Sequence, residues 1–207
     1  MLKILGKSSS INVRKLLWTC DELGLPFERE DWGAGFQSTA APEFLALNPN
    51  AMVPVIIDDG FVLWESNTIC RYLCARNNGE ALLPSAPQGR ARVEQWMDWQ
   101  ATELNSAWRY AFMALVRHDA AFSDPAQVQA SIDNWNRQIG ILDRHLEAVG
   151  GFVAGDRFTL ADIVLGLSIN RWLLTPMARP DYPFVAAWYR RLGGRAGFAA
   201  WCENGTP

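Results

Sequence analysis

The segment that most constrains the fold is a pair of short apolar runs joined by Asp59-Gly60. Both runs are rich in β-branched or aromatic residues, and Asp-Gly is a strong signal for a two-residue hairpin turn. The segment 53–64, "VPVIIDDGFVLW", therefore predicts an antiparallel hairpin. The fold must therefore contain a sheet that includes this hairpin, and the elements on either side of the hairpin indicate the fold class.

Strands and helices alternate on both sides of the hairpin. An apolar strand over 2–5 is followed by a helix whose apolar residues recur at the spacing of one buried face and which ends at Gly24. An extended segment after Pro26, a short helix near 42–47 and a longer helix over 65–76 complete the series. The order strand–helix–strand–helix–strand–strand–helix over the first ~80 residues is typical of an α/β fold.

The second half of the chain has a different, wholly helical pattern. Gly and Pro residues separate the halves, so we assign residues 1–79 to an α/β domain, 80–88 to a linker and 89–207 to an all-α domain. Sustained amphipathic periodicity predicts long helices in this all-α domain. Thr159, with Asp162 three positions later, has the spacing of a capping box at the start of one of them.

Composition and charge exclude several classes of function. The chain has 207 residues, of which 49% are hydrophobic and 20% charged, and such a chain folds into a globule. The formal net charge of −3 and the lack of a basic stripe argue against nucleic-acid binding. No apolar run approaches the ~20 residues that span a bilayer, and no signal peptide is evident. We therefore expect no membrane association and a cytoplasmic location.

The four cysteines do not form a redox or metal-binding motif. Cys70 and Cys74 lie about one helical turn apart, but no second ligand pair accompanies them. Helix packing is therefore favoured over metal binding, and we expect no metal. The chain has no Cys-x-x-Cys pair, which argues against dithiol redox chemistry.

A polar loop, "KSSSINVRK", separates the first strand from the first helix. Ser10 precedes Ile11, the expected first helical residue, so its hydroxyl is expected to accept a helix N–H as an N-cap. The loop lacks the glycines of a phosphate-binding loop, and the chain lacks the G-x-S-x-G motif of a serine hydrolase. A third interpretation stays open. At the positive end of the helix, Ser10 or Asn12 donates a hydrogen bond to a substrate thiolate, which lowers the pKa of that thiol.

Two further segments allow both a structural and a ligand-binding interpretation. Pro54 opens a strand, where it cannot donate a ladder hydrogen bond. It marks either an edge strand or a cis Val53–Pro54 bond that turns the Val53 N–H and C=O toward an extended peptide. Where the hairpin meets the next helix, Ser66 either caps that helix or binds a ligand carboxylate. Glu65 beside it offers a carboxylate partner for an ammonium group. The α-amino acid end of a ligand has both a carboxylate and an ammonium group, so it needs both kinds of partner.

The order and spacing of these segments resemble the glutathione transferase family. The resemblance rests on "SSSINVRKLLWTCDELGLPFE", "NPNAMVPVIIDDGFVLWESNTICRYL" and "GDRFTLADIVL", and it covers nearly the whole chain. It implies a thioredoxin-like α/β domain, a linker and an all-helical domain. It also implies a cytoplasmic homodimer that uses glutathione as co-substrate.

The resemblance implies a role for each candidate residue. Ser10, or Asn12 as in some bacterial members, would stabilise the glutathione thiolate. Val53, followed by a cis Pro54, would bind the cysteinyl backbone, and Asp162 would have a folding role in the helical domain. The other glutathione-binding candidates are Glu65 and Ser66 for the γ-glutamyl end, Gln37 and Asn50 for the glycyl end, and Asp98 for the site of a partner subunit.

The implied reaction is attack of the glutathione thiolate on an apolar electrophile held between the domains. Five side chains either line this pocket or pack between helices: Asn105, Trp108, Arg109, Phe112 and Trp172. The polar loop has neither the cysteine nor the tyrosine that other classes use, which argues against mixed-disulfide chemistry. Two alternatives stay open: glutathione-dependent reduction of disulfides or peroxides, and a non-enzymatic protein that uses the same fold to carry ligands or act as a scaffold.

Overall fold

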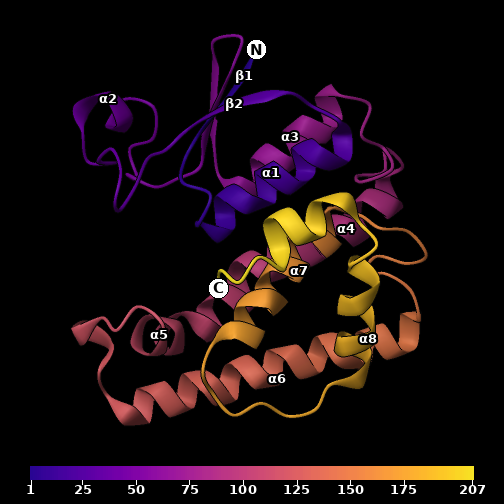
Figure 1. Ribbon diagram of the computed structural model, residues 1–207. Helices are drawn as coiled ribbons and strands as arrows, with labels where there is room; N and C mark the ends of the chain where they lie inside the picture. The colour runs from indigo at the N-terminus through magenta and orange to yellow at the C-terminus, as the bar shows by residue number, and fades with distance from the viewer.

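The computed structural model describes residues 1–207, and it has an α/β part followed by an all-helical part, as predicted (Figure 1). The first part contains a four-stranded mixed sheet with the strand order β2-β1-β3-β4. β1 pairs in parallel with β2 and antiparallel with β3, and β3 pairs antiparallel with β4. The strands are β1 (Leu2–Leu5), β2 (Phe27–Glu30), β3 (Val55–Asp58) and β4 (Phe61–Trp64).

The hairpin predicted around Asp59-Gly60 is confirmed. Asp58 pairs with Phe61, so Asp59 and Gly60 form a two-residue turn between β3 and β4. Both turn residues have positive φ, 50° for Asp59 and 89° for Gly60, as a type I′ turn requires. The turn residues thus determine the register of this pair of strands.

Three helices accompany the sheet: α1 (Ile11–Leu23), α2 (Pro42–Leu45) and α3 (Ser66–Arg76). α1 ends at Gly24 in the left-handed conformation, as predicted. Ser10 is its N-cap residue, but the Ser10 side chain makes no capping hydrogen bond, so that part of the prediction is wrong. The loop is instead closed through the main chain, where the Ser10 N–H donates to the Lys7 carbonyl at 3.1 Å.

The second part of the chain contains only helices. α4 (Pro87–Trp99), a π-helical turn (Gln100–Leu104) and α5 (Asn105–Leu115) follow one another without a break. α4 begins inside the segment 80–88 that was predicted as linker, because a proline fits the first turn of a helix, where no N–H donor is needed. The later helices are α6 (Pro125–Val149), α7 (Leu160–Leu174) and α8 (Pro183–Leu192), with short turns at Ala120–Phe122 and Phe198–Cys202. None of the helices combines the length and the apolar character that crossing a bilayer requires.

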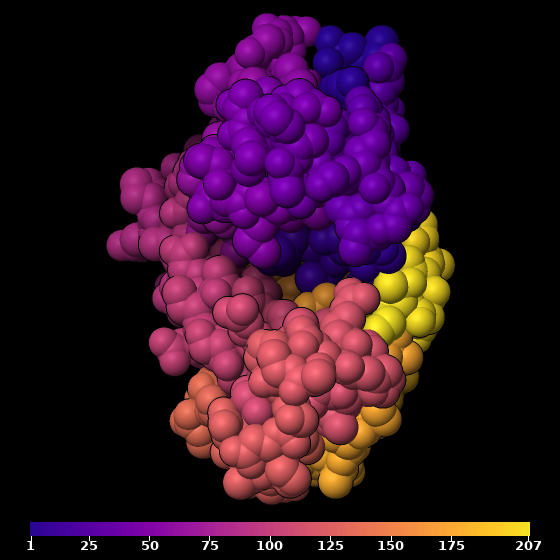
Figure 2. All heavy atoms as spheres, turned by 90° about the vertical axis from the view of Figure 1, so that its left-hand side faces the viewer, coloured from indigo at the N-terminus to yellow at the C-terminus, as the bar shows by residue number.

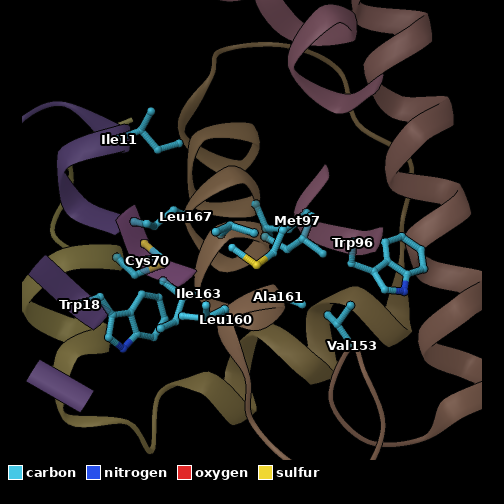
Figure 3. Packing of buried hydrophobic residues seen from close by; sticks show 14 of the residues in the cluster. Ile11, Trp18, Cys70, Trp96, Met97, Val153, Leu160, Ala161, Ile163 and Leu167 are labelled. Atoms are coloured by element: carbon cyan, nitrogen blue, oxygen red, sulfur yellow. The ribbon is translucent and has the colours of Figure 1, made fainter. Parts of the chain in front are cut away.

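The central helix α7 joins the two parts of the molecule. Leu160 and Ile163 of α7 lie beside Trp18 of α1 and Cys70 of α3, within one large buried cluster (Figure 3). Trp18 is completely buried, and a Cβ at Gly197 would stand only 2.4 Å from its ring. The indole of Trp18 therefore fills a close-fitting space between the first domain and the C-terminal segment.

Asp162 holds the start of α7 together from a fully buried position. Its carboxylate accepts hydrogen bonds from the backbone N–H groups of Val153 and Thr159, both at 2.9 Å, and from the Thr159 hydroxyl at 3.1 Å. The indole of Trp188 on α8 donates to it at 2.8 Å. The predicted capping box is confirmed. Burial raises the pKa of Asp162, and the donors oppose that rise.

We expect Asp162→Ala to lower the free energy of unfolding by about 3 kcal/mol or more, because it leaves four buried donors without an acceptor. Urea denaturation followed by circular dichroism, at one fixed protein concentration, measures this loss. Asp156→Ala is the matched control, since Asp156 is exposed and should change stability by less than about 0.5 kcal/mol. Equal stability of the two variants would contradict a structural role for the Asp162 carboxylate.

Candidate active site

Three loop segments meet at one end of the sheet because of the strand register. Leu5, the last residue of β1, pairs with Val55, the first residue of β3. Val55 in turn pairs with Trp64, the last residue of β4. The polar loop after β1, the proline segment before β3 and the start of α3 after β4 are therefore neighbours in space.

Gly6 allows the polar loop to lie against the proline segment. Its φ of 149° is uncommon for residues with a side chain, and a Cβ there would stand 2.5 Å from Val13 Cγ2 and 3.1 Å from Val53 Cβ. The Gly6 N–H is bonded to the Glu30 carbonyl at 2.8 Å. The loop that carries Ser10 is thus packed directly beside Val53.

The Val53–Pro54 peptide bond is cis, as the resemblance implied. Pro54 is buried, whereas Val53 is partly exposed. The N–H and C=O of Val53 take part in no backbone hydrogen bond within the chain. They remain available to an extended ligand in the way that the edge of a sheet accepts an added strand.

The junction of β4 with α3 has an unusual backbone. Glu65 has φ 73° and ψ 106°, a left-handed region that non-glycine residues rarely occupy, and such residues cluster at binding sites. The Glu65 side chain is exposed, while Ser66, the first residue of α3, is buried. The Ser66 hydroxyl donates to Asn12 Oδ1 at 3.4 Å and so links the N-termini of α3 and α1.

A buried ammonium group lies behind this junction. Lys15 of α1 is only 2% exposed, and its Nζ donates to Asn67 Oδ1 at 3.0 Å and to Gln100 Oε1 at 2.9 Å. A third, longer contact of 3.5 Å joins it to Ser66 Oγ. No carboxylate forms an ion pair with it, and burial lowers the pKa of Lys15 to about 8. Lys15 therefore joins α1, α3 and the π-helical turn through three oxygen acceptors.

The same network continues into the helical domain. Gln100 Nε2 donates to Asn105 Oδ1 at 3.0 Å, and the indole of Trp108 donates to the same oxygen at 3.0 Å. Gln100 and Asn105 are five residues apart, and the π-helical turn brings residues at this spacing together. A continuous series of hydrogen bonds thus leads from Asn12 at the polar loop to Trp108 on α5.

The structure brings together three of the five residues suggested for an electrophile pocket. Trp108 and Phe112 stack edge to face with ring centroids 5.4 Å apart, and Asn105 is bonded to Trp108. Trp172 instead donates to Asn136 Oδ1 at 2.9 Å and packs on Tyr182, and Arg109 is exposed on α5. Arg171 of α7 joins the first three, with its guanidinium carbon 4.5 Å from the Trp108 ring centre and 4.1 Å from that of Phe112.

The remaining candidates are surface residues with partners of their own. Gln37 Nε2 donates to Glu30 Oε1 at 3.0 Å, and Asn50 donates to Asn48 Oδ1 at 3.0 Å. Asp98 forms an ion pair with Arg71, and the Asp98 side chain is 65% exposed. The four cysteines are reduced and buried, which fits the expectation that Cys70 and Cys74 serve helix packing.

Comparison with known proteins decides the family. Residues 9–76 match the family described as "Glutathione S-transferase, N-terminal domain", and residues 125–191 match "Glutathione S-transferase, C-terminal domain". The chain is 36% identical over 197 residues to glutathione S-transferase GstB of Escherichia coli K12, with 94% of each chain covered. The chain belongs to the glutathione S-transferase family.

Solved structures and a plant relative agree with this family assignment. The theta class glutathione S-transferase of Xanthomonas axonopodis pv. citri, solved with glutathione bound, superposes with a TM-score of 0.87 at 36% identity, covering 97% of this chain and 96% of that one. Glutathione S-transferase 3 of Zea mays is 31% identical over 210 residues, with 95% of this chain and 91% of the maize protein covered. The two-domain fold of the family therefore extends over essentially the whole chain.

Sequence reasoning missed the buried polar residues of this family member. Lys15, Asn67, Gln100 and Arg171 did not stand out, since each is an ordinary polar residue within a helix. One signal was present for Arg171, which is the only charged side chain in the last three, mostly apolar turns of α7. Lys15 follows Arg14 in the sequence, and such a pair is usually solvated.

The lowered pKa of Lys15 predicts a specific dependence of stability on pH. Between the folded pKa of about 8 and the ordinary value of 10.5, the unfolded chain binds more protons at Lys15, so stability rises with pH. Relative to Lys15→Met, we expect the unfolding free energy of the native protein to increase by about 2 kcal/mol from pH 7.5 to 9.5. Urea denaturation at a series of pH values measures the difference.

Taking this difference removes the titration of groups that the two proteins share, such as the buried cysteines. Lys7→Met is the control for removing an ammonium group that is not buried, because the Lys7 ammonium bonds a surface carbonyl, that of Ala34. A constant difference between native protein and Lys15→Met across this pH range would show that Lys15 is not a buried charge.

Proposed function

We propose that this protein is a glutathione transferase that binds glutathione along the end of its sheet and activates the thiol for attack on an electrophile between the domains. The observation that carries the proposal is the meeting of Ser10, Val53 and Ser66 at one end of the sheet, imposed by the register of β1, β3 and β4. The glutathione bound to the Xanthomonas relative supports the same ligand here.

The cysteinyl unit of glutathione fits between Val53 and Ser10. The unused N–H and C=O of Val53 pair with the cysteinyl backbone as in an added strand, which directs the thiol toward the start of α1. The Ser10 hydroxyl makes no bond to its own helix and is free to donate to the sulfur. That donor and the positive end of α1 together lower the pKa of the bound thiol from its usual ~8.5.

The γ-glutamyl end fits the start of α3. The free N–H groups at this helix terminus suit the α-carboxylate, as does the Ser66 hydroxyl once it turns away from Asn12 Oδ1, and the exposed Glu65 carboxylate suits the ammonium group. Lys15 lies directly behind Ser66 and adds positive charge for the carboxylate. Asn12 is a second donor candidate for the sulfur, because only its carbonyl oxygen is occupied, by Ser66.

Gln37 and Asn50 are assigned to the glycyl end, and Asp98 to the site of a partner subunit in a homodimer. Gln37 and Asn50 are exposed in the loops on either side of α2, so a small rotation of each amide frees it for a carboxylate. Exposed Phe61 and Trp64 on the edge strand β4 support an interface between two copies.

In the proposed reaction, the thiolate sulfur attacks an electrophilic carbon, and a carbon–sulfur bond forms. With a halide substrate the carbon–halogen bond breaks and the halide leaves with its bonding pair. With an activated alkene the electron pair moves to the far carbon, which takes a proton from solvent. The protein contributes positioning and a lowered thiol pKa, and no general base is required.

Reduction of disulfides or peroxides with glutathione is the alternative activity. Burial raises the pKa of Cys70 to about 11 and raises that of Cys20 further, so the chain has no reactive thiolate of its own. That chemistry would need two glutathione molecules at the site. Comparing the turnover of an aryl halide with the turnover of a small disulfide distinguishes the two reactions. The second alternative is a non-enzymatic role, and an absence of glutathione binding in calorimetry would favour it over both enzymatic activities.

We expect Ser10→Ala to raise the pKa of bound glutathione by about one unit, because the thiolate loses a charge-assisted hydrogen bond. Titration of the thiolate by its ultraviolet absorbance measures this pKa. Ser9→Ala is the matched control, since Ser9 is exposed in the same loop and should leave the pKa unchanged. An unchanged pKa in Ser10→Ala would transfer the role to Asn12 or to a backbone N–H.

We expect Glu65→Gln to weaken glutathione binding about tenfold, because the ligand ammonium loses a charged acceptor. Isothermal titration calorimetry gives the affinity. Glu147→Gln, an exposed change of the same charge on α6, should bind glutathione like the native protein. If both variants bind equally well, the γ-glutamyl end does not lie at the start of α3.

A further inference from the structure

We propose that the electrophile site of this transferase is built for an anionic substrate, with Arg171 of α7 binding a carboxylate attached to an aromatic or apolar electrophile. This inference rests on the proposed function for the reaction, although the anion site itself can be tested without it.

A hollow between the two domains provides the place. Figure 2 shows it below the indigo and purple atoms of the first domain, with pink atoms of the second domain beside and below it. Orange atoms, the colour of the chain around α7, are visible at the bottom of the hollow. α7 thus forms its floor, next to the α5 helix that carries Trp108 and Phe112.

Arg171 of α7 is buried without an anionic partner. It is 4% exposed, its Nε has no hydrogen-bond partner, and no carboxylate of the chain forms an ion pair with it. Its guanidinium lies over the faces of Trp108 and Phe112, at 4.5 and 4.1 Å from the ring centres. The rings supply cation–π attraction but no acceptor for its N–H donors.

Two other arginines, Arg14 and Arg179, do have oxygen acceptors. Arg14, also buried, donates to the carbonyls of Trp201 and Thr206 at 3.3 and 2.9 Å, and to further oxygens of the C-terminal segment. Arg179 donates to the carbonyls of Trp172 and Thr175 at the end of α7, at 3.1 and 2.6 Å. Burying a cation without such partners is unfavourable, and a bound anion would remove the penalty.

The groups that act on Arg171 are cations. Burial, together with the positive charges of Arg14 and Arg117, lowers the pKa of Arg171 to about 9, so Arg171 is still charged at neutral pH. Arg117 also approaches the Phe112 ring, at 5.4 Å from its centre, and the positive charge of Arg171 reaches Lys15. The field around Arg171 is therefore positive, and a substrate anion would be attracted toward it.

The shape of the ligand follows from these contacts. A guanidinium fork pairs with both oxygens of a carboxylate, and the two aromatic rings beside it favour a flat or apolar body. An aryl halide with a ring carboxylate has both features. The glutathione sulfur attacks the carbon that bears chlorine, a carbon–sulfur bond forms, and chloride leaves with the bonding pair of the carbon–chlorine bond. The thiol proton has already passed to solvent.

The test compares 4-chloro-3-nitrobenzoate with its methyl ester, which has the same reacting carbon but no charge. We expect Arg171→Gln to reduce kcat/KM for the acid at least about tenfold and to change kcat/KM for the ester less than about threefold. Arg137→Gln, which removes an exposed charge on α6, should change neither. Equal losses on acid and ester, or no loss on the acid, would overturn the proposal, because a merely structural arginine does not distinguish the two.

A binding measurement keeps the proposal testable if Arg171→Gln does not fold or if neither substrate is turned over. Nitroaromatic quenching of tryptophan fluorescence compares 3-nitrobenzoate with methyl 3-nitrobenzoate in the native protein and in Arg171→Lys. If the native protein binds the acid more tightly than the ester, and Arg171→Lys loses this preference, the anion site is supported. That result holds even if no glutathione conjugate forms, because an absence of conjugate would count against the transferase proposal and not against the anion site. No preference for the acid would overturn the anion site.

Discussion

The packing of α1 against α7 is the contact on which the rest of the structure depends. α1 faces the sheet on one side and α7 on the other, so nearly every residue from Ile11 to Cys20 is buried, charged ones included. Buried cations require oxygen acceptors. Arg14 finds them in the C-terminal segment, and Lys15 finds them in α3 and in the π-helical turn. Arg14 and Lys15 therefore obtain their oxygen acceptors only when the two domains are packed together.

The same contact connects the proposed glutathione site with the proposed electrophile site. Lys15 stands behind Ser66, where the γ-glutamyl end would bind, and also holds Gln100. Gln100 leads through Asn105 to Trp108 at the electrophile side. A displacement of the π-helical turn would therefore move groups at both the glutathione side and the electrophile side of the proposed site. Arg171 differs from the other buried cations in that its acceptor is left for a ligand to supply.

Features that depend on neighbours in sequence were predictable. Asp59-Gly60 specifies a turn with two positive φ values, and Thr159 with Asp162 lies within one helical turn. Features that depend on distant partners were not. Lys15 and Gln100 are 85 positions apart, and helical periodicity cannot tell a solvated stripe from one that another domain will cover. The predicted Ser10 cap is an exception among the local features, because a main-chain bond from the Ser10 N–H to the Lys7 carbonyl closes that loop and the side chain makes no cap.

The sequence by itself determined the order of strands and helices, the hairpin and its register, the start and end of α1 and the capping of α7. Each of these follows from short-range chemistry of turns, caps and apolar spacing. Only the tertiary structure decided that Lys15 and Arg171 are buried, that Trp172 packs on Tyr182 apart from Trp108, and that the Val53 backbone is unpaired. Burial and hydrogen-bond satisfaction are properties of two docked domains, and no single segment contains them.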